Sequence, residues 1–235
     1  MARTATLASL QTQALQRADI PATTTRYATG ETAEYVNQSM AELYGVLVQS
    51  DEDFYTVSVP LTTVGGQADY TFAALVTDDD VFKFRGLDIP VTGGFKRTAE
   101  RLEWAERNDF TGPLPMYIAG FPMKYHVTAD KLTLYPTPSG GLLCTFWYVP
   151  NPPRLDAAGT ITFDGCSGWE EYIVLDVAAK MLVKDALLEE AGMLLQQKEL
   201  LKQGILATRQ RDISGPRHIS RKRNRTMMWP YLRGW

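Results

Sequence analysis

The chain has 235 residues, of which 45% are hydrophobic and 22% are charged, and its formal net charge is −3. These values are ordinary for a globular protein of one large or two small domains. No apolar run approaches the roughly 18 residues of a transmembrane helix, so no membrane partner is expected. Residues 1–7 lack the long apolar core of a secretory signal, which predicts synthesis in the cytoplasm.

The first fifth of the sequence predicts two helices. Residues 4–17, rich in Ala, Leu, Gln and Thr, favour a short helix, and residues 19–29, with Pro21 and several threonines, favour a loop. From Glu31 the apolar residues recur at steps of three and four, which is typical of a helix packed on one side. These residues are Val36, Met40, Leu43, Tyr44 and Leu47. Thr29 is the expected N-cap of this second helix.

Strand patterns follow the second helix. Residues 54–61 alternate with period two, residues 64–67 form a glycine-containing turn, and residues 70–72 are expected to resume the sheet. Residues 81–89 are another strand candidate. Residues 96–107 are polar and charged, and they predict a short exposed helix.

The strongest strand signal lies between residues 116 and 149. Residues 124–128 and 131–135 flank the two-residue turn Ala129-Asp130 and predict a hairpin. Residues 142–149 are rich in aromatic and β-branched residues and follow a Ser-Gly-Gly turn. We expect these three strands to form a meander.

Two more helices are expected after residue 165. A capping box begins the first of them, with Ser167 as the cap and Glu170 returning to its amide. One wide apolar face of that helix carries Trp169, Ile173, Val174, Val177, Ala178, Met181, Leu182 and Leu188. Gly192 is expected to mark a turn or bend before the next helix, and Gly204 and residues 212–216 are expected to end regular structure. Leu194, Leu195, Leu201 and Ile205 are the apolar residues of that last helix.

The order of these elements predicts an α+β fold. We expect residues 1–50 and 165–208 to form a helical bundle and residues 51–164 to form a β-rich insertion. Residues 209–235 are expected to form an extended C-terminal tail.

The sequence predicts neither an enzyme nor a cofactor, because no catalytic or metal-binding constellation is found in it. His126 lies in a predicted strand without Cys, His or Asp at metal-ligand spacing. The acidic run at residues 78–80 is expected to be a solvated turn rather than a cation site. Cys144 and Cys166 are expected to be buried thiols, although a disulfide between them stays open.

The C-terminal segment differs in charge from the rest of the chain. After residue 208 there are eight basic residues and one acid, Asp212, so this segment carries +7 and leaves −10 for the remainder. Four of the basic residues form a cluster that can contact DNA phosphates or an acidic partner. They are Arg221, Lys222, Arg223 and Arg225.

The end of this segment is apolar and aromatic. The residues concerned are Met227, Met228, Trp229, Tyr231, Leu232 and Trp235. Exposed aromatic residues promote aggregation, so such an end is typical of a docking peptide that becomes ordered on a partner. A disordered, solvated end and DNA contact as the main role are the alternatives. We interpret the tail as a docking segment.

Four segments occur in an order that is informative as a whole. Residues 34–44 read EYVNQSMAELY, residues 81–88 contain Lys-Phe-Arg-Gly, and residues 120–138 contain Gly-Phe-Pro, a hairpin and Tyr-Pro-Thr-Pro. Residues 146–155 run from Phe-Trp-Tyr-Val-Pro to a leucine. In this order they resemble the head-to-tail connector (adaptor) protein family of tailed bacteriophages, over roughly residues 4–207.

The resemblance implies a structural virion protein in the phage neck, at the head–tail junction, made in the host cytoplasm. It implies a homo-oligomeric ring, a dodecamer, that binds beneath the portal protein with its C-terminal extension along the portal. A tail or neck protein is expected below the ring, and double-stranded DNA is expected to pass through it during packaging and ejection. The basic tail gives the alternative, a nucleic-acid-binding protein.

Overall fold

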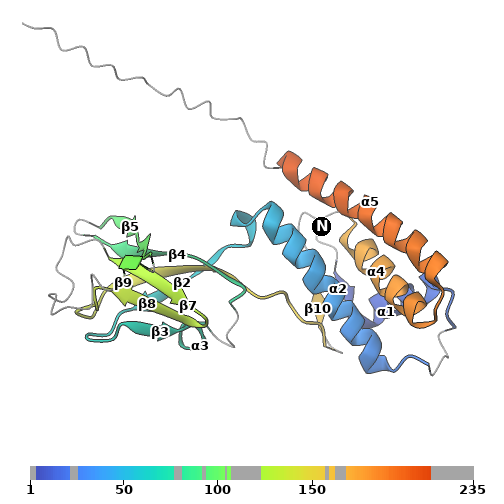
Figure 1. The fold of residues 1–235 in the computed structure, drawn as a ribbon, viewed down its shortest axis with the longest axis horizontal. Helices are drawn as coiled ribbons and strands as arrows, with labels where there is room; N and C mark the ends of the chain where they lie inside the picture. The colour runs from blue at the N-terminus through green and yellow to red at the C-terminus, as the bar shows by residue number, and fades with distance from the viewer. Residues whose placement is uncertain are drawn as a thin grey trace, which may run out of the picture.

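The computed structural model describes residues 4–21, 26–76, 81–91, 94–103, 105–106, 123–156, 159–161 and 168–212, without the side chains of Thr29 and residues 209–212. The fold is α+β, as the sequence predicts, and has two parts that lie end to end (Figure 1). The helical part contains helices α1, α2, α4 and α5 with strands β1 and β10. The β part contains strands β2 to β9 with the short helix α3.

Four helices build the helical part around α4. They are α1 (Leu7–Arg17), α2 (Thr29–Ser50), α4 (Trp169–Lys184) and α5 (Leu188–Asp212). Helix α4 contacts the other three and is buried along most of its length, which confirms its predicted wide apolar face. The strands β1 (Ala5–Thr6) and β10 (Thr160–Ile161) pair antiparallel at the start of α1. Among the described residues, no helix is long and apolar enough to cross a membrane.

Two four-stranded sheets form the β part and share one apolar core. The first has the order β2 (Val57–Thr62), β9 (Leu143–Val149), β4 (Lys83–Pro90), β5 (Lys96–Thr98). The second has the order β3 (Asp69–Thr71), β8 (Lys131–Tyr135), β7 (Lys124–Thr128), β6 (Glu100–Arg101). A 3-10 turn, η1 (Asp53–Tyr55), precedes β2, and α3 (Phe72–Leu75) follows β3. Leu87 and Phe146 from the first sheet and Leu132 and Leu134 from the second are fully buried in one cluster.

The predicted three-stranded meander is wrong, although the hairpin within it is confirmed. Strands β7 and β8 pair antiparallel around Ala129, which has a φ of 51°. Strand β9 does not pair with β8 but crosses to the other sheet, between β2 and β4. The connection contains Pro136, which cannot donate to a ladder. The backbone N–H of Thr63 donates to Leu142 O (2.9 Å) and that of Gly141 to Thr63 O (2.8 Å), which places β9 beside β2.

The short helix predicted over residues 96–107 is wrong within the described residues. Residues 96–98 form β5, antiparallel to β4, and residues 100–101 form β6, parallel to β7. Ala99 and Leu102 are buried, whereas the charged residues around them are exposed. Both strands lie at sheet edges, where charged side chains discourage further pairing. The charge that suggested a solvated helix therefore marks two sheet edges.

The predicted helix caps are wrong by one residue each. Ala28, not Thr29, is the N-cap of α2, because the N–H groups of Glu31 and Thr32 donate to its carbonyl. Gly168 is the N-cap of α4, with φ of 84° and no side-chain cap hydrogen bond, and the predicted cap Ser167 lies outside the described residues.

The break between the last two helices lies at residues 185–187 and not at Gly192, where it was predicted. Helix α4 ends at Lys184, and Ala186, with φ of 61°, turns the chain into α5. Leu188 therefore begins α5 and is 65% exposed, instead of lying on the buried face of α4. Gly192 and Gly204 both lie inside α5, which continues to Asp212 and so past the expected start of the tail at residue 209. A glycine inside a helix costs roughly 1 kcal/mol, which the packing of α5 on α4 offsets.

Candidate interaction surfaces

The residues predicted for docking and for DNA contact lie outside the described residues, and they stay predictions. They are Met227, Met228, Trp229, Tyr231, Leu232 and Trp235, together with Arg221, Lys222, Arg223 and Arg225. The acidic run at residues 78–80 and Cys166 also lie outside the described part of the chain.

A cluster of polar and charged residues around the buried Asp176 joins α5 to the rest of the helical part. Asp176 of α4 is 2% exposed, and its carboxylate accepts from Ser39 Oγ of α2 at 2.5 Å. Lys180 Nζ lies 2.7 Å from Asp176 Oδ2, and Lys198 Nζ of α5 lies 2.6 Å from Oδ1. Glu42 of α2 contacts both lysines. We name these five residues the Asp176 cluster; it joins three helices through side chains that the sequence analysis did not single out.

The charges of this cluster stabilise one another. Burial on its own favours the neutral carboxyl, but hydrogen bonds from Lys180, Lys198 and Ser39 lower the pKa of Asp176 below its ordinary value. Burial likewise opposes the charged form of Lys198, yet the hydrogen bond and charge of Asp176 raise the pKa of that lysine. Lys198 also lies over the Tyr172 ring, 5.5 Å from its centroid. Both shifts favour the charged forms of Asp176 and Lys198.

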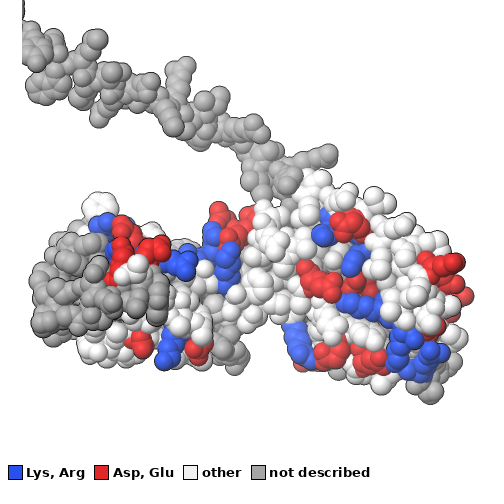
Figure 2. Space-filling view, in the orientation of Figure 1, with Lys and Arg blue, Asp and Glu red and all other residues white. Residues whose placement is uncertain are grey.

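The opposite side of α5 is exposed and carries no charge over four turns. Ala191, Leu194, Leu201 and Ile205 pack inward on α4 and α2. The exposed residues, which we name the outer face of α5, are Met193, Gln196, Gln197, Leu200, Gln203, Gly204 and Ala207. Met193 is 58% exposed and Leu200 is 70% exposed. In Figure 2 the surface along the upper edge of α5 is white, while red and blue side chains lie along its lower flank and at its start. An uncharged helix face of this kind suits contact with another protein.

The β part presents a different exposed surface, on the first sheet. Trp147 of β9 is 36% exposed, and its indole Nε1–H donates to Asp88 Oδ2 of β4 at 2.7 Å. The hydroxyl of Thr98 donates to the other oxygen of Asp88 at 2.8 Å. Leu143, four residues before Trp147 on the same strand, is 60% exposed. The ring of Trp147 is thus held in place on an open sheet face.

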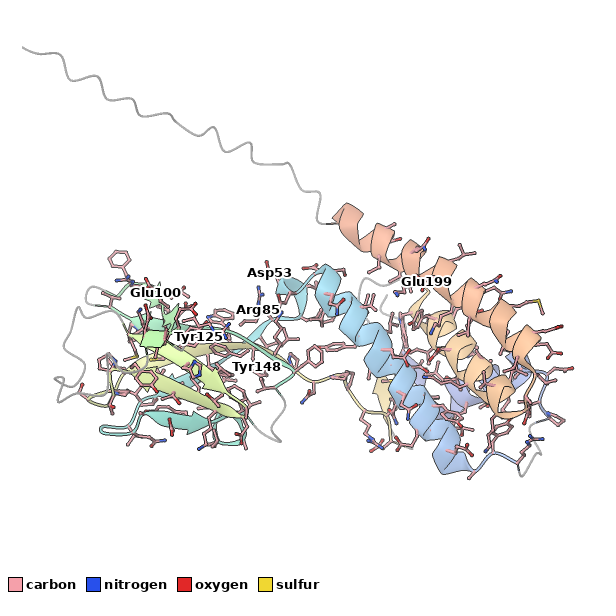
Figure 3. All side chains as sticks on the ribbon, in the orientation of Figure 1. Asp53, Arg85, Glu100, Tyr125, Tyr148 and Glu199 are labelled. Carbon is pink, nitrogen blue, oxygen red and sulfur yellow. The ribbon has the colours of Figure 1, made fainter. Side chains whose placement is uncertain are left out.

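The two parts meet at the end of α2. The Tyr44 ring makes edge contacts with Tyr55 and Phe82, at centroid distances of 5.1 and 5.9 Å, and the Tyr44 hydroxyl donates to Pro150 O at 2.9 Å. Arg85 of β4 pairs with Asp53 at 2.5 Å and also with Glu52. Figure 3 shows Asp53 and Arg85 close together near the end of α2. We name this region the joint.

His126 and Cys144 are the histidine and the cysteine that the structure describes in the β part. His126 lies in β7, as predicted, and the described residues contain no group of His, Cys, Asp and Glu suited to a metal ion. Cys144 is free and fully buried, and burial raises the pKa of its thiol to about 11, which makes it unreactive.

Comparison with known proteins assigns the class. A family model described as SU10 adaptor protein matches residues 5–226, so this chain belongs to that family of phage adaptor proteins. No curated protein matches the chain. The chain is thus a structural phage adaptor protein, a class whose members lie at the head–tail junction of the virion and contact other virion proteins, as the sequence resemblance implies in outline.

Proposed function

We propose that this adaptor is the repeating subunit of a ring that joins the portal to the tail in the phage neck. The outer face of α5 carries this proposal. The Asp176 cluster holds α5 rigidly, yet Met193 and Leu200 on its other side are left in solvent. Exposed apolar side chains on an ordered helix are stabilised when another subunit covers them. The family match supports the same role.

A ring of identical subunits uses one heterologous contact, repeated until it closes. Obligate interfaces commonly exceed about 2,000 Å² of buried surface, so we expect both the helical part and the β part to contribute. Twelve copies is the number implied by the sequence resemblance, and we keep it as part of the proposal.

The resemblance implies the partners, and the C-terminal tail and the net charge of the chain suggest how they are contacted. We assign the portal to the aromatic residues of the tail, and a neck or tail protein to the other side of the ring. Double-stranded DNA passes through the ring. The net charge of −10 before residue 209 repels phosphate, which limits adhesion of the DNA to the channel wall.

The test combines the purified protein with the portal ring of the same phage and measures affinity and copy number, by interferometry and electron microscopy. Replacing Trp229, Tyr231 and Trp235 with serine is expected to weaken portal binding more than tenfold, because the tail then loses its apolar anchors. The matched control replaces Arg221, Lys222, Arg223 and Arg225 with glutamine and is expected to change it less than threefold. Failure of the unaltered protein to bind the portal at any stoichiometry would count decisively against the proposal.

The second candidate function, nucleic-acid binding, is favoured by the +7 charge after residue 208. It predicts duplex affinity that falls steeply with salt, with a log–log slope of about −0.9 per neutralised phosphate. The glutamine variant then loses most of its affinity for DNA and the serine variant keeps it. The opposite ranking, measured with a random-sequence duplex, excludes DNA binding as the main role.

A further inference from the structure

A second helix of the helical part also has an exposed face without charge. In α1, Leu7, Leu10 and Ala14 point inward and are buried. Its exposed uncharged residues, which we name the outer face of α1, are Ala8, Thr12, Gln13 and Gln16; the exposed Arg17 ends the helix. The sequence from Thr4 to Gln16 contains no charged residue. At about 1.5 Å per residue, α1 is roughly 16 Å long, which is comparable to the roughly 21 Å of the outer face of α5.

The surroundings of these two faces are charged. Glu199 and Lys202 pair at 3.5 Å along one flank of α5, and Arg17 pairs with Glu171 at the end of α1. The exposed side of α2 carries Glu34, which pairs with Arg154. A charged partner, such as nucleic acid, finds no complement on either uncharged face. The outer faces of α1 and α5 resemble each other: both lack charged residues, and both combine small residues with glutamines.

The two faces point in different directions. Helix α1 packs on α4 and α2, while α5 packs on another side of α4 (Figure 1). One molecule therefore cannot bring its own two faces together. A heterologous contact needs two different patches on each subunit, which this arrangement supplies.

We propose that the outer face of α5 in one copy packs against the outer face of α1 in the next copy. This inference rests on the proposed ring and names the surfaces that close it. Gly204 and Ala207 on α5 and Ala8 on α1 have little or no side chain, so the two backbones approach closely. Leu200 inserts between the small residues, and glutamine amides from both helices hydrogen-bond across the contact.

Cysteine cross-linking tests the pairing directly. The protein carries Thr12→Cys and Leu200→Cys together, in a Cys166→Ser background; Cys144 is buried. Oxidation on the assembled ring, with the portal ring present, is expected to give a ladder of covalent multimers on a denaturing gel. Each single variant is expected to stay monomeric, because a heterologous contact places two copies of the same residue apart. Ring assembly of every variant is checked first by electron microscopy.

The outcomes separate the two proposals. A ring without a ladder overturns the α5–α1 pairing and leaves the ring itself standing. Dimers from Leu200→Cys alone also overturn it, because they show α5 packed on α5. If the unaltered protein forms no ring with or without the portal, the proposed function fails and the pairing fails with it.

A charge exchange gives an independent test. Leu200→Lys and Thr12→Glu are each expected to weaken assembly at least tenfold, because each buries one charge in the contact. The double variant is expected to assemble at least threefold better than either single variant, because the two opposite charges then pair across the contact. Val183→Lys, on a half-exposed residue of α4 outside both faces, is the matched control and is expected to weaken assembly less than threefold. Equal losses in the double variant and in either single variant overturn the pairing.

Discussion

The helical part and the β part both have an apolar core, but each adds a different kind of contact to it. In the helical part, Asp176 and Lys198 place opposite charges inside the bundle, within hydrogen-bonding distance. In the β part, the core is aromatic: Phe146 lies 5.1 Å from Phe84 and 5.6 Å from Phe72, between ring centroids. Ion pairs are directional and fix one helix against another, whereas aromatic burial depends on area and shape. We propose that the helical part forms the ring contact. In this part the Asp176–Lys198 ion pair helps to set the position of α5 on α4.

The difference also shows on the two surfaces. The helical part exposes uncharged helix faces, while the β part exposes a tryptophan held by Asp88 on an open sheet. A rigid bundle with uncharged faces suits a permanent contact between copies, since no charge has to be desolvated. Substitutions in the two parts should therefore differ in how much they lower the free energy of unfolding, in where hydrogen exchange rises and in how the effect depends on pH.

The largest effect is expected from Phe146→Ala in the β part. Phe146 is fully buried, and removing its ring should lower the free energy of unfolding by about 4 kcal/mol. Hydrogen–deuterium exchange followed by mass spectrometry should show faster exchange in β2, β4 and β9, with α4 still protected. Leu143→Ala, on an exposed residue of the same strand, is the control and should change stability by less than about 0.5 kcal/mol. Equal loss of protection in α4 would mean that the two parts unfold as one.

The next largest effect is expected from Asp176→Asn in the helical part. The substitution removes the buried carboxylate from Lys180 and Lys198, which keep only the more exposed Glu42, and breaking a buried pair in this way costs roughly 3 kcal/mol. Exchange should rise in α5 first, because Lys198 is its charged contact with α4. Glu199→Gln on the exposed side of α5 is the matched control, with an expected change below about 0.5 kcal/mol. A stability change in Asp176→Asn no larger than in that control would show that the cluster does not hold α5.

The same cluster predicts a pH dependence that the aromatic core lacks. The pKa of Asp176 is lower in the folded protein than in the unfolded chain, so its contribution is present above the unfolded value of about 4. It is lost as the pH falls through the folded pKa. The pKa of Lys198 is raised, so its contribution is present below about 10.4 and is lost at higher pH.

Urea unfolding at several pH values checks this dependence. The stability difference between the unaltered protein and Asp176→Asn should be constant between about pH 5 and pH 9 and should shrink below about pH 4. The difference for Phe146→Ala should not change with pH. A constant difference for Asp176→Asn down to pH 2 would contradict the assignment of the carboxylate as the charged centre.

Sequence reasoning succeeded where one local pattern decides the outcome. The apolar spacing of Val36, Met40 and Leu43 identified α2, and the alternation around Ala129-Asp130 identified the β7–β8 hairpin. It failed where tertiary contacts decide. Strand β9 pairs with β2, which lies about eighty residues earlier in the sequence, and no local signal reports that choice.

The surfaces were harder to predict than the elements. Asp176 sits inside an apolar stripe, and only the folded protein shows that Ser39 and Lys198 reach it. The outer face of α5 was hidden because Gly192 and Gly204 suggested breaks, although they lie within one continuous helix. The signal that could have found this face is the absence of charge at exposed helical spacing from Met193 to Ala207.

The smallest effect is expected at the joint, where the two kinds of core meet. Tyr44→Phe keeps the edge contacts with Tyr55 and Phe82 and removes only the hydroxyl that donates to Pro150 O. One such hydrogen bond contributes about 1 kcal/mol. Tyr35→Phe removes a hydroxyl at a similar distance, 2.8 Å from Glu31, but Glu31 keeps Lys184 as a partner, so this control should change stability less.

Exchange in residues 149–156 gives the readout that stability alone does not. Residues 149–156 connect β9 to the helical part. If the Tyr44 hydroxyl couples the two parts, Tyr44→Phe should speed hydrogen exchange in these residues, whereas Tyr35→Phe should not. Equal exchange in the two variants would show that the aromatic edge contacts hold the joint without the hydroxyl. The joint would then depend on ring packing, as the contacts of Phe146 with Phe84 and Phe72 do in the β part, rather than on directional polar bonds such as those of the Asp176 cluster.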